Sequence, residues 1–194
     1  MNIETVKPEY RELILKAATE VVDLRGADLR GANLSDADLR GADLSGTNLS
    51  GTNLSWADLR GADLSGTNLS WADLSWADLR GADLSGTNLS WADLSGTNLS
   101  GTNLSWADLR GADLSGTNLR GANLKVYQAG EWISYITPSH IRIGCQFHET
   151  KKWREFSDSE IDAMNRNALA YWKENKAIVL SIAESFVEQE KKFS

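Results

Sequence analysis

The sequence predicts an all-β solenoid, in which the chain turns a corner once in every five residues and wraps around a common apolar axis. From Leu24 to Leu124 every fifth residue is Leu, and this register never slips. Leucines five residues apart would spiral around all sides of an α-helix, and they would alternate between the two faces of a straight strand. Gly, Asn, Asp and Ser, which favour turns, surround each Leu. A corner in each unit therefore lets every Leu point inward.

The five-residue unit begins with Ala, Thr or Val and continues with Asp or Asn, Leu, a residue such as Ser or Arg, and usually Gly or Trp. Over residues 22–126 this A(D/N)LXX pattern, as in GADLS, GTNLS, WADLS and GANLK, resembles the pentapeptide-repeat family. The resemblance implies a right-handed quadrilateral parallel β-helix, with the Leu and the residue two before it inside. RGADLSGTNLS recurs at Arg40, Arg60 and Arg80, which independently supports twenty residues per coil, and hence about five coils at the ~4.8 Å spacing of parallel strands.

The segments on either side of the repeats are expected to cap the open ends of the solenoid. Tyr10, Leu13 and Ile14 lie at helical spacing after Pro8, a residue that suits a first helical turn. After the repeats, EWISYIT and HIRIGCQF read as two short strands. We therefore expect four segments, namely an N-terminal cap helix over residues 1–20, the β-helix over 21–126, short strands and a loop that cap the last coil over 127–156, and a C-terminal helical segment over 157–194.

An amphipathic helix is expected in the C-terminal segment. Ser157 and Glu160 form a capping-box pattern that opens it. Its apolar face either docks back on the end of the solenoid or joins two chains in a homodimer, and family members that dimerise end to end through C-terminal helices favour the dimer. The tail also resembles the ends of pentapeptide-repeat proteins carried by phages and prophages. The candidate dimer residues on this face are Tyr171, Trp172, Ile178, Val179, Ile182 and Phe186.

Composition and charge narrow the classes of function. The net charge of -7 argues against direct binding of nucleic acid or of an anionic membrane surface, and it leaves open a basic partner. No run of 18 consecutive apolar residues occurs, and the N-terminal residues lack the pattern of a signal peptide. The single Cys145 rules out an internal disulfide framework. We therefore expect a soluble, cytoplasmic protein.

The sequence carries no catalytic motif. It contains no nucleophile elbow, phosphate-binding loop or HExxH pattern, so we expect neither enzyme activity nor a cofactor. His140, Cys145 and His148 form the one cluster of metal-ligand residue types. On a single regular strand His140 and His148 would share one face and Cys145 would point to the other. We therefore expect no metal site there.

Residues twenty apart should lie above one another, which sorts the outward side chains into columns. One column is predicted to be self-neutralising, because Arg40, Arg60, Arg80 and Arg120 are flanked by Asp38, Asp58 and Asp78. A second column is acidic and gives the most DNA-like face of the solenoid. It consists of Asp23, Asp43, Asp63 and Asp83, and it is completed by Asn103 and Asn123.

Tryptophan replaces Gly at some outward corners. Trp76 is predicted to lie above Trp56, and Trp91 above Trp71, on two adjacent corners, while Trp106 occupies a third. Aromatic neighbours about 5 Å apart would stack and brace the coils. Contiguous exposed aromatic side chains also mark binding surfaces. Both interpretations stay open, and these five Trp residues form the candidate interface.

Two hypotheses for function remain. The first is a scaffold that binds a protein partner through the Trp residues and the charged faces. The second is DNA mimicry, which the family resemblance suggests because quinolone-resistance members occupy the DNA-binding groove of DNA gyrase; the target would be gyrase, a topoisomerase or another DNA-handling enzyme such as a host nuclease. Residues 21–125 hold thirteen Asp against eight Arg or Lys, and this excess is about a third of the charge on duplex DNA of equal length. The charge therefore favours the scaffold.

Overall fold

The computed structural model describes residues 24–129, 132–144, 146–165 and 167–193. The chain forms two compact units, which divide between Ala122 and Asn123. The helix expected over residues 1–20 lies outside the described residues, and so does Asp23. Each unit is described by itself below.

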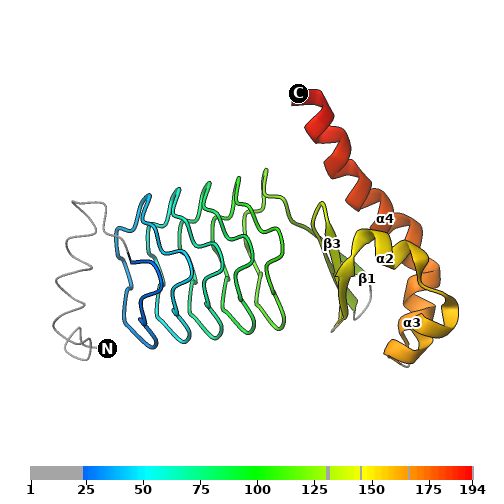
Figure 1. Cartoon of the computed structure of the whole chain (residues 1–194), viewed down its shortest axis with the longest axis horizontal. Coiled ribbons are helices and arrows are strands. Elements are labelled where there is room, and N and C mark those ends of the chain that lie inside the picture. The colour runs from blue at the N-terminus through cyan, green and yellow to red at the C-terminus, as the bar shows by residue number, and fades with distance from the viewer. Residues whose placement is uncertain (1–23, 130–131, 145, 166, 194) are drawn as a thin grey trace. The chain divides into compact units, whose positions relative to one another are not determined.

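The first unit is a stack of coils (Figure 1). The Asp or Asn of each pentapeptide pairs with the residue twenty positions later in a parallel bridge, from Asp28 with Asn48 onward to Asn98 with Asn118. One coil therefore contains four pentapeptides. Each bridge has hydrogen bonds on both sides, since Leu29 N donates to Asn48 O at 2.8 Å and Asn48 N donates to the carbonyl of residue 27 at 2.9 Å. This ladder joins successive coils.

Each corner is a four-residue turn that begins at Leu. In the turn that starts at Leu44, Thr47 N donates to Leu44 O at 3.1 Å, and the third residue, Gly46, has a φ of 66°. A turn closed in this way, with positive φ at its third residue, is a type II turn, which favours Gly there. Ser45 N also donates to Asp43 Oδ1 at 3.1 Å, which is an Asx turn. Turn chemistry thus explains the repeated order of Asx, Leu, Ser and Gly.

The interior of the coils is built from two inward positions in each pentapeptide. The Leu side chains from Leu44 to Leu104 have an exposed fraction of 0%, which confirms the predicted inward direction. The residue two before each Leu is mostly Ala or Thr, and the Thr hydroxyls find partners inside. Thr47 Oγ1 donates to Leu44 O at 2.7 Å, and Thr67 Oγ1 donates to the same carbonyl at 3.0 Å. Buried hydroxyls therefore cost little here, because they are hydrogen-bonded.

The second unit is an antiparallel sheet with helices on one face (Figure 1). The strands follow chain order across the sheet and each pairs with the next. They are β1 (Lys125–Ala129), β2 (Trp132–Ile136), β3 (His140–Ile143) and β4 (Gln146–Glu149). The helices that follow in the described part of the chain are α2 (Thr150–Glu155), α3 (Asp158–Met164) and α4 (Ala168–Phe193).

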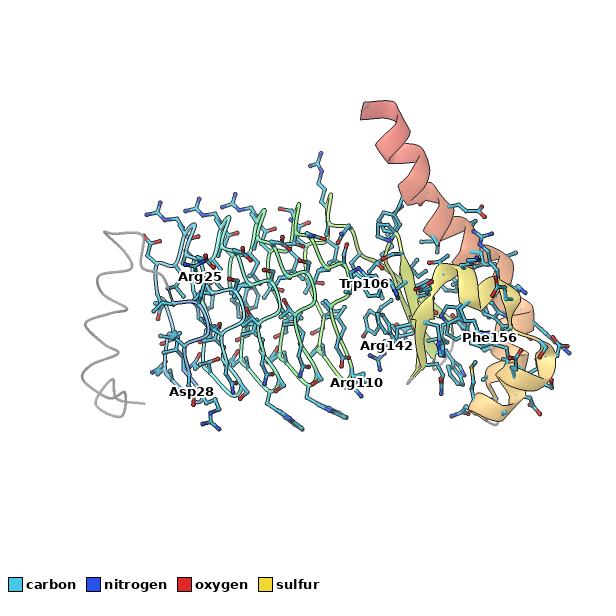
Figure 2. All side chains as sticks on the ribbon, in the orientation of Figure 1. Arg25, Asp28, Trp106, Arg110, Arg142 and Phe156 are labelled. Atoms are coloured by element: carbon cyan, nitrogen blue, oxygen red, sulfur yellow. The ribbon has the colours of Figure 1, made fainter. Side chains whose placement is uncertain are left out.

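An aromatic and aliphatic cluster forms the core of the second unit. Because Ile136 pairs with Ile141 across β2 and β3, both side chains point to the same face of the sheet. Trp153 of α2 packs against this face and donates its Nε1–H to Ile141 O at 2.7 Å. Its ring lies 5.1 Å from that of Trp172 in α4 and 5.4 Å from that of Phe156, which follows α2. Figure 2 labels Phe156 beside these helices. The core therefore rests on specific large side chains rather than on a repeat.

The second unit differs from the sequence-based expectation in its details. HIRIGCQF forms a hairpin of β3 and β4 rather than one strand, and Gly144 between them has a positive φ of 58°. The expected capping box is present, because Ser157 accepts from Glu160 N and Glu160 accepts from Ser157 N. It opens the short α3, which ends at Met164, and α4 begins separately at Ala168. Lys125–Ala129 and Thr150–Glu155, for which no element was expected, form β1 and α2.

Candidate functional site

Four of the five candidate Trp side chains form two stacked pairs on the outside of the coils. The rings of Trp56 and Trp76 have centroids 5.4 Å apart and planes inclined by 9°. Those of Trp71 and Trp91 are also 5.4 Å apart, with planes inclined by 11°. The two pairs stand on adjacent corners, since Trp71 and Trp76 bracket a single pentapeptide of one coil. Trp106 stands on a third corner.

These Trp residues occupy the turn position that favours Gly. Their φ angles lie between 61° and 65°, in the left-handed region that a bulky L-residue rarely adopts. Even in this position the side chains remain 55–67% exposed. The five corners thus combine backbone strain with a large aromatic surface in solvent.

The stacked rings lean toward the coil that follows them in the sequence. A Cβ atom added at Gly96 would lie 2.8 Å from Trp76 Cδ2, and one added at Gly111 would collide with the Trp91 ring. On the opposite side the space is open, because a Cβ atom added at Gly51 would meet nothing within 4 Å. Gly51 occupies the position twenty before Trp71, so the outer ring face of Trp71 is left accessible at this end of the stack.

A column of carboxylates runs between the two Trp corners. Its members are Asp73, Asp93 and Asp113, which pair in successive bridges. Asp73 Oδ1 accepts hydrogen bonds from Ser75 N at 2.9 Å and from Ser75 Oγ at 2.6 Å. No ion pair joins these three carboxylates to a basic side chain of any described residue. Sequence reasoning overlooked this column, although sorting the residues by twenty brings it together.

We call the surface between these corners the Trp face. It comprises five pentapeptides, counted here from the corner residue, which begin at residues 31, 51, 71, 91 and 111, together with the corner residues that follow them. None of these pentapeptides contains Lys or Arg. The other three sides of the coils carry basic residues, namely Arg25 on one side, Arg30 and Arg110 on the next, and Arg40, Arg60, Arg80 and Arg120 on the third.

The acidic column that the sequence analysis singled out lies on the opposite side of the coils, ten residues away from the Trp face. Asp43, Asp63 and Asp83 pair in successive bridges. Asp43 Oδ2 lies 3.6 Å from Arg25 Nε, and Asp83 Oδ1 accepts from Asn103 Nδ2 at 3.0 Å. Both ends of this described column are therefore tied to neighbouring side chains.

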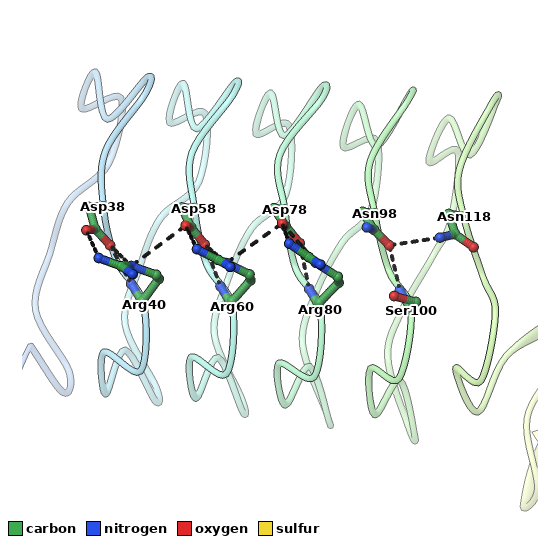
Figure 3. Close-up of polar contacts among 9 residues, drawn as sticks. All are labelled: Asp38, Arg40, Asp58, Arg60, Asp78, Arg80, Asn98, Ser100 and Asn118. Carbon is green, nitrogen blue, oxygen red and sulfur yellow. Dashed lines mark hydrogen bonds and ion pairs between the residues drawn. The ribbon is translucent and has the colours of Figure 1, made fainter.

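The stripe of Asp and Arg residues neutralises itself, as predicted (Figure 3). Arg40 Nη2 lies 2.6 Å from Asp38 Oδ2, and Arg40 Nε lies 3.7 Å from Asp58 Oδ2 on the next coil. The hydrogen bond from Arg40 lowers the pKa of Asp38 to about 2. Hydrogen bonds from Arg60 and Arg80 likewise lower the pKa of Asp58 and Asp78. Arg40, Arg60 and Arg80 thus each join the carboxylate of their own pentapeptide, whereas Arg120 follows Asn118, and the charge of this side largely cancels.

The structure places most of the candidate dimer residues inside the second unit. Tyr171, Trp172, Val179 and Phe186 are buried in its core, and Ile182 packs against that core. Tyr171 shares a hydrogen bond of 2.6 Å with Ser134 Oγ of β2. Ile178 is exposed. The apolar face of α4 is therefore mostly covered by the sheet of its own chain.

His140 and His148 do not converge on a site. They belong to the two strands of the hairpin, where Glu149 is the partner of His140 and Ile141 that of His148, so the two imidazoles lie on opposite faces of the sheet. His140 stacks on Phe147, and His148 contacts the edges of Trp153 and Phe156. Within the described ranges no group of His, Cys, Asp and Glu has the arrangement of a metal site. No described helix is long and apolar enough to cross a membrane.

Comparison with known proteins agrees with this architecture. The family model for pentapeptide repeats matches residues 22–55, 47–86 and 87–125, in eight copies. No curated protein matches the chain significantly. Similar solved structures include a pentapeptide repeat protein from the thylakoid lumen of Arabidopsis thaliana, with 29% identity over 60% of this chain and 74% of that one and a TM-score of 0.41.

Two further solved structures are similar to part of the chain. HetL, a pentapeptide repeat protein involved in heterocyst differentiation regulation in the cyanobacterium Nostoc, is 37% identical over 53% of this chain and 60% of its own, with a TM-score of 0.26. QnrB1, a plasmid-mediated fluoroquinolone resistance protein, is 25% identical over 53% of this chain and 68% of its own, with a TM-score of 0.25. Because the family model covers more than half of the sequence, the chain belongs to the pentapeptide repeat family, and its coils form the right-handed quadrilateral β-helix of that family.

Proposed function

We propose that the protein is a non-catalytic scaffold that binds a protein partner through the Trp face. The observation that supports this is the presence of strained, exposed Trp side chains at corners where Gly fits without strain. An L-residue in the left-handed region costs about 1–2 kcal/mol. A stacked aromatic pair contributes about 0.5–1.5 kcal/mol of stability beyond the contribution of the area that it buries.

Stability alone does not account for these residues. The Trp side chains are less than half buried, so the burial term, at about 25 cal/mol per Å², roughly balances the strain. When a residue changes the stability of the fold so little, a role in binding explains its presence better than a role in folding. Clustered Trp side chains are typical of the centres of protein interfaces, where a partner completes their burial.

The proposal is tested by comparing variants that keep the fold. The triple variant Trp71→Gly, Trp76→Gly, Trp91→Gly removes most of the Trp face, and Trp106→Gly is the matched control on another corner. Each protein is used to co-purify partners from the cells that produce it, after circular dichroism has shown native coils. We expect a partner that is lost with the triple variant and kept with the control. A partner retained equally by the triple variant would rule out the Trp face as the binding site.

DNA mimicry is the second candidate, and the carboxylates without an ionic partner favour it. On one side of the coils Asp63 and Asp83 are half-buried, and on the opposite side Asp73 is half-buried while Asp93 and Asp113 are exposed. These five carboxylates could face a basic surface. Against it, duplex DNA carries about three charges per 4.8 Å. Most coils of this protein contain two or three Asp, and the first coil, over residues 21–40, contains four Asp together with three Arg.

A supercoiling assay with DNA gyrase decides between the two candidates. The protein is added at rising concentration, alongside the variant Asp63→Asn, Asp83→Asn and the triple Trp variant. Inhibition that the Asn variant weakens and the Trp variant keeps would favour mimicry. Light scattering on the same samples tests the predicted homodimer, for which Ile178 is the exposed member of the candidate residues on α4.

A further inference from the structure

The Trp face combines three features that together select a partner group. It presents flat aromatic surfaces on two adjacent corners, a column of carboxylates between them, and no basic residue in its pentapeptides. Aromatic ring faces attract cations through their quadrupole. Carboxylates attract the same groups through charge and hydrogen bonds. The Trp rings and the Asp carboxylates are therefore both complementary to a cationic ligand.

We propose that the Trp face binds an arginine side chain of the partner, with the guanidinium stacked on the outer ring face of Trp71 and hydrogen-bonded to Asp73. This inference rests on the proposed function, because it names the group through which a protein partner would bind. The space for it lies above Gly51, where an added Cβ atom would meet nothing within 4 Å. The basic residues of the neighbouring side do not compete for this space, since Arg30 is held by Asp28 at 2.6 Å and Arg110 is held by Asp108 at 2.6 Å.

The geometry favours arginine over lysine. A guanidinium is planar, so it can lie flat on an indole while its edge presents a fork of N–H donors to a carboxylate. Asp73 and Trp71 are two residues apart in one coil, which places a carboxylate beside the stacking surface. Asp73 Oδ1 is fixed by Ser75, and no described residue bonds to its Oδ2. The carboxylate is thus oriented in advance and has a free acceptor atom.

Asp93 repeats the carboxylate on the next coil, where the Trp91 ring is already stacked on Trp71. It follows Trp91 by two residues, as Asp73 follows Trp71, and its Oδ1 accepts from Ser95 N at 2.8 Å. Asp93 is exposed, and no described basic side chain pairs with it. A partner segment that runs along the coil axis therefore meets carboxylates at the ~4.8 Å interval of the coils. This matches a segment with more than one basic residue.

The test uses synthetic peptides on the full-length protein, with binding measured by titration calorimetry. Three peptides share one sequence and differ at two central positions, which hold arginine, lysine or citrulline. Citrulline keeps the planar shape of arginine and removes its charge. We expect the arginine peptide to bind at least tenfold more tightly than the citrulline peptide, with lysine in between, and we expect its affinity to fall as salt rises.

Variants show whether the named residues are responsible. Trp71→Gly should abolish binding of the arginine peptide, and Asp73→Asn with Asp93→Asn should weaken it at least tenfold, whereas Asp63→Asn with Asp83→Asn should leave it unchanged. Equal affinity for arginine and citrulline, or equal binding by the Asp73, Asp93 variant, would overturn the inference. So would the absence of any binding by the arginine peptide. If binding of a co-purified partner depends on Trp71 but not on Asp73, the proposed scaffold function would stand, and only the inference that the partner binds through arginine would be wrong.

Discussion

The two units are stabilised in opposite ways. In the coils one set of contacts is repeated, so that Leu44 and Leu84 occupy equivalent positions and donate equivalent hydrogen bonds to the next coil. In the second unit the contacts are unique, as in the hydrogen bond from Trp153 to Ile141 and that between Tyr171 and Ser134. The turns and the hydrogen-bond ladder of the coils depend on the backbone, on the Asp or Asn of each unit and on the inward side chains. The other outward positions of the repeat are therefore free to vary. The coils therefore offer an outer surface that is available for binding, whereas the second unit uses its aromatic residues in its own core.

The same residue type illustrates this difference. Trp153 and Trp172 of the second unit are almost completely buried, whereas the five corner Trp residues of the coils are mostly exposed. A buried Trp contributes to folding through its full apolar area. An exposed one at a strained corner contributes little. Variants in the two settings should therefore have very different consequences.

The largest effect is expected from a charge placed on the axis of the coils. Leu74→Lys puts an ammonium group where the exposed fraction is 0%, and a buried charge without a partner is strongly unfavourable. We expect the coils to unfold, measured as loss of the native circular dichroism and of a cooperative urea transition. Ser50→Arg is the control, because Arg30 and Arg110 already occupy its column. Native spectra for Leu74→Lys would contradict the inward direction of Leu.

The repeat unit could be predicted from the sequence because one physical constraint recurs. A Leu at every fifth position excludes helix and straight strand, and turn-forming residues supply the corners. The Trp pairs and the Asp38–Arg40 stripe then follow from sorting by twenty. The positive φ at Trp71 could also have been predicted, since Trp replaces Gly in a turn that needs it.

The second unit was predicted less well because its contacts are not periodic. HIRIGCQF was read as one strand, since only the Gly144 conformation reveals the hairpin. The apolar residues of α4 were correctly grouped on one face, but the sequence does not say what covers that face. The sheet that covers it is held by single contacts, such as Tyr127 Oη to Asn175 Oδ1 at 2.7 Å, and no spacing predicts such a pair.

A much smaller effect is expected when a stacked Trp pair is removed. Trp56→Gly with Trp76→Gly relieves the strain at two corners and loses one stack, and these changes nearly cancel. We expect the free energy of unfolding to change by less than about 2 kcal/mol, as measured by urea denaturation. Trp153→Ala in the second unit is the comparison, where loss of a buried Trp should cost about 3–5 kcal/mol. A loss of similar size at both sites would mean that the corner pair braces the coils and would weaken the proposed binding role.

The smallest effect concerns the acid stability of the Asp and Arg stripe. The pKa of Asp38 is about 2 in the folded chain, against about 4 in an unfolded chain, and the pKa values of Asp58 and Asp78 are also lowered. A lowered folded pKa contributes stability that is present above pH 4 and is lost as the pH falls toward 2. The effect is modest because these pairs are exposed to solvent and screened by salt.

Urea midpoints measured between pH 5 and pH 2.5 test this contribution. The variant Asp38→Asn, Asp58→Asn, Asp78→Asn should lose less stability on acidification than the native chain, and the difference should shrink in high salt. The control is Asp63→Asn, Asp83→Asn, Asp93→Asn, which removes as many carboxylates from positions that lack an Arg two residues later. If both variants flatten the pH dependence equally, the backbone N–H hydrogen bonds that both sets of carboxylates accept are the cause and the ion pairs are not. If only the first does, the charge of this side is committed to the fold, and the Trp face keeps the carboxylates that a basic partner can use.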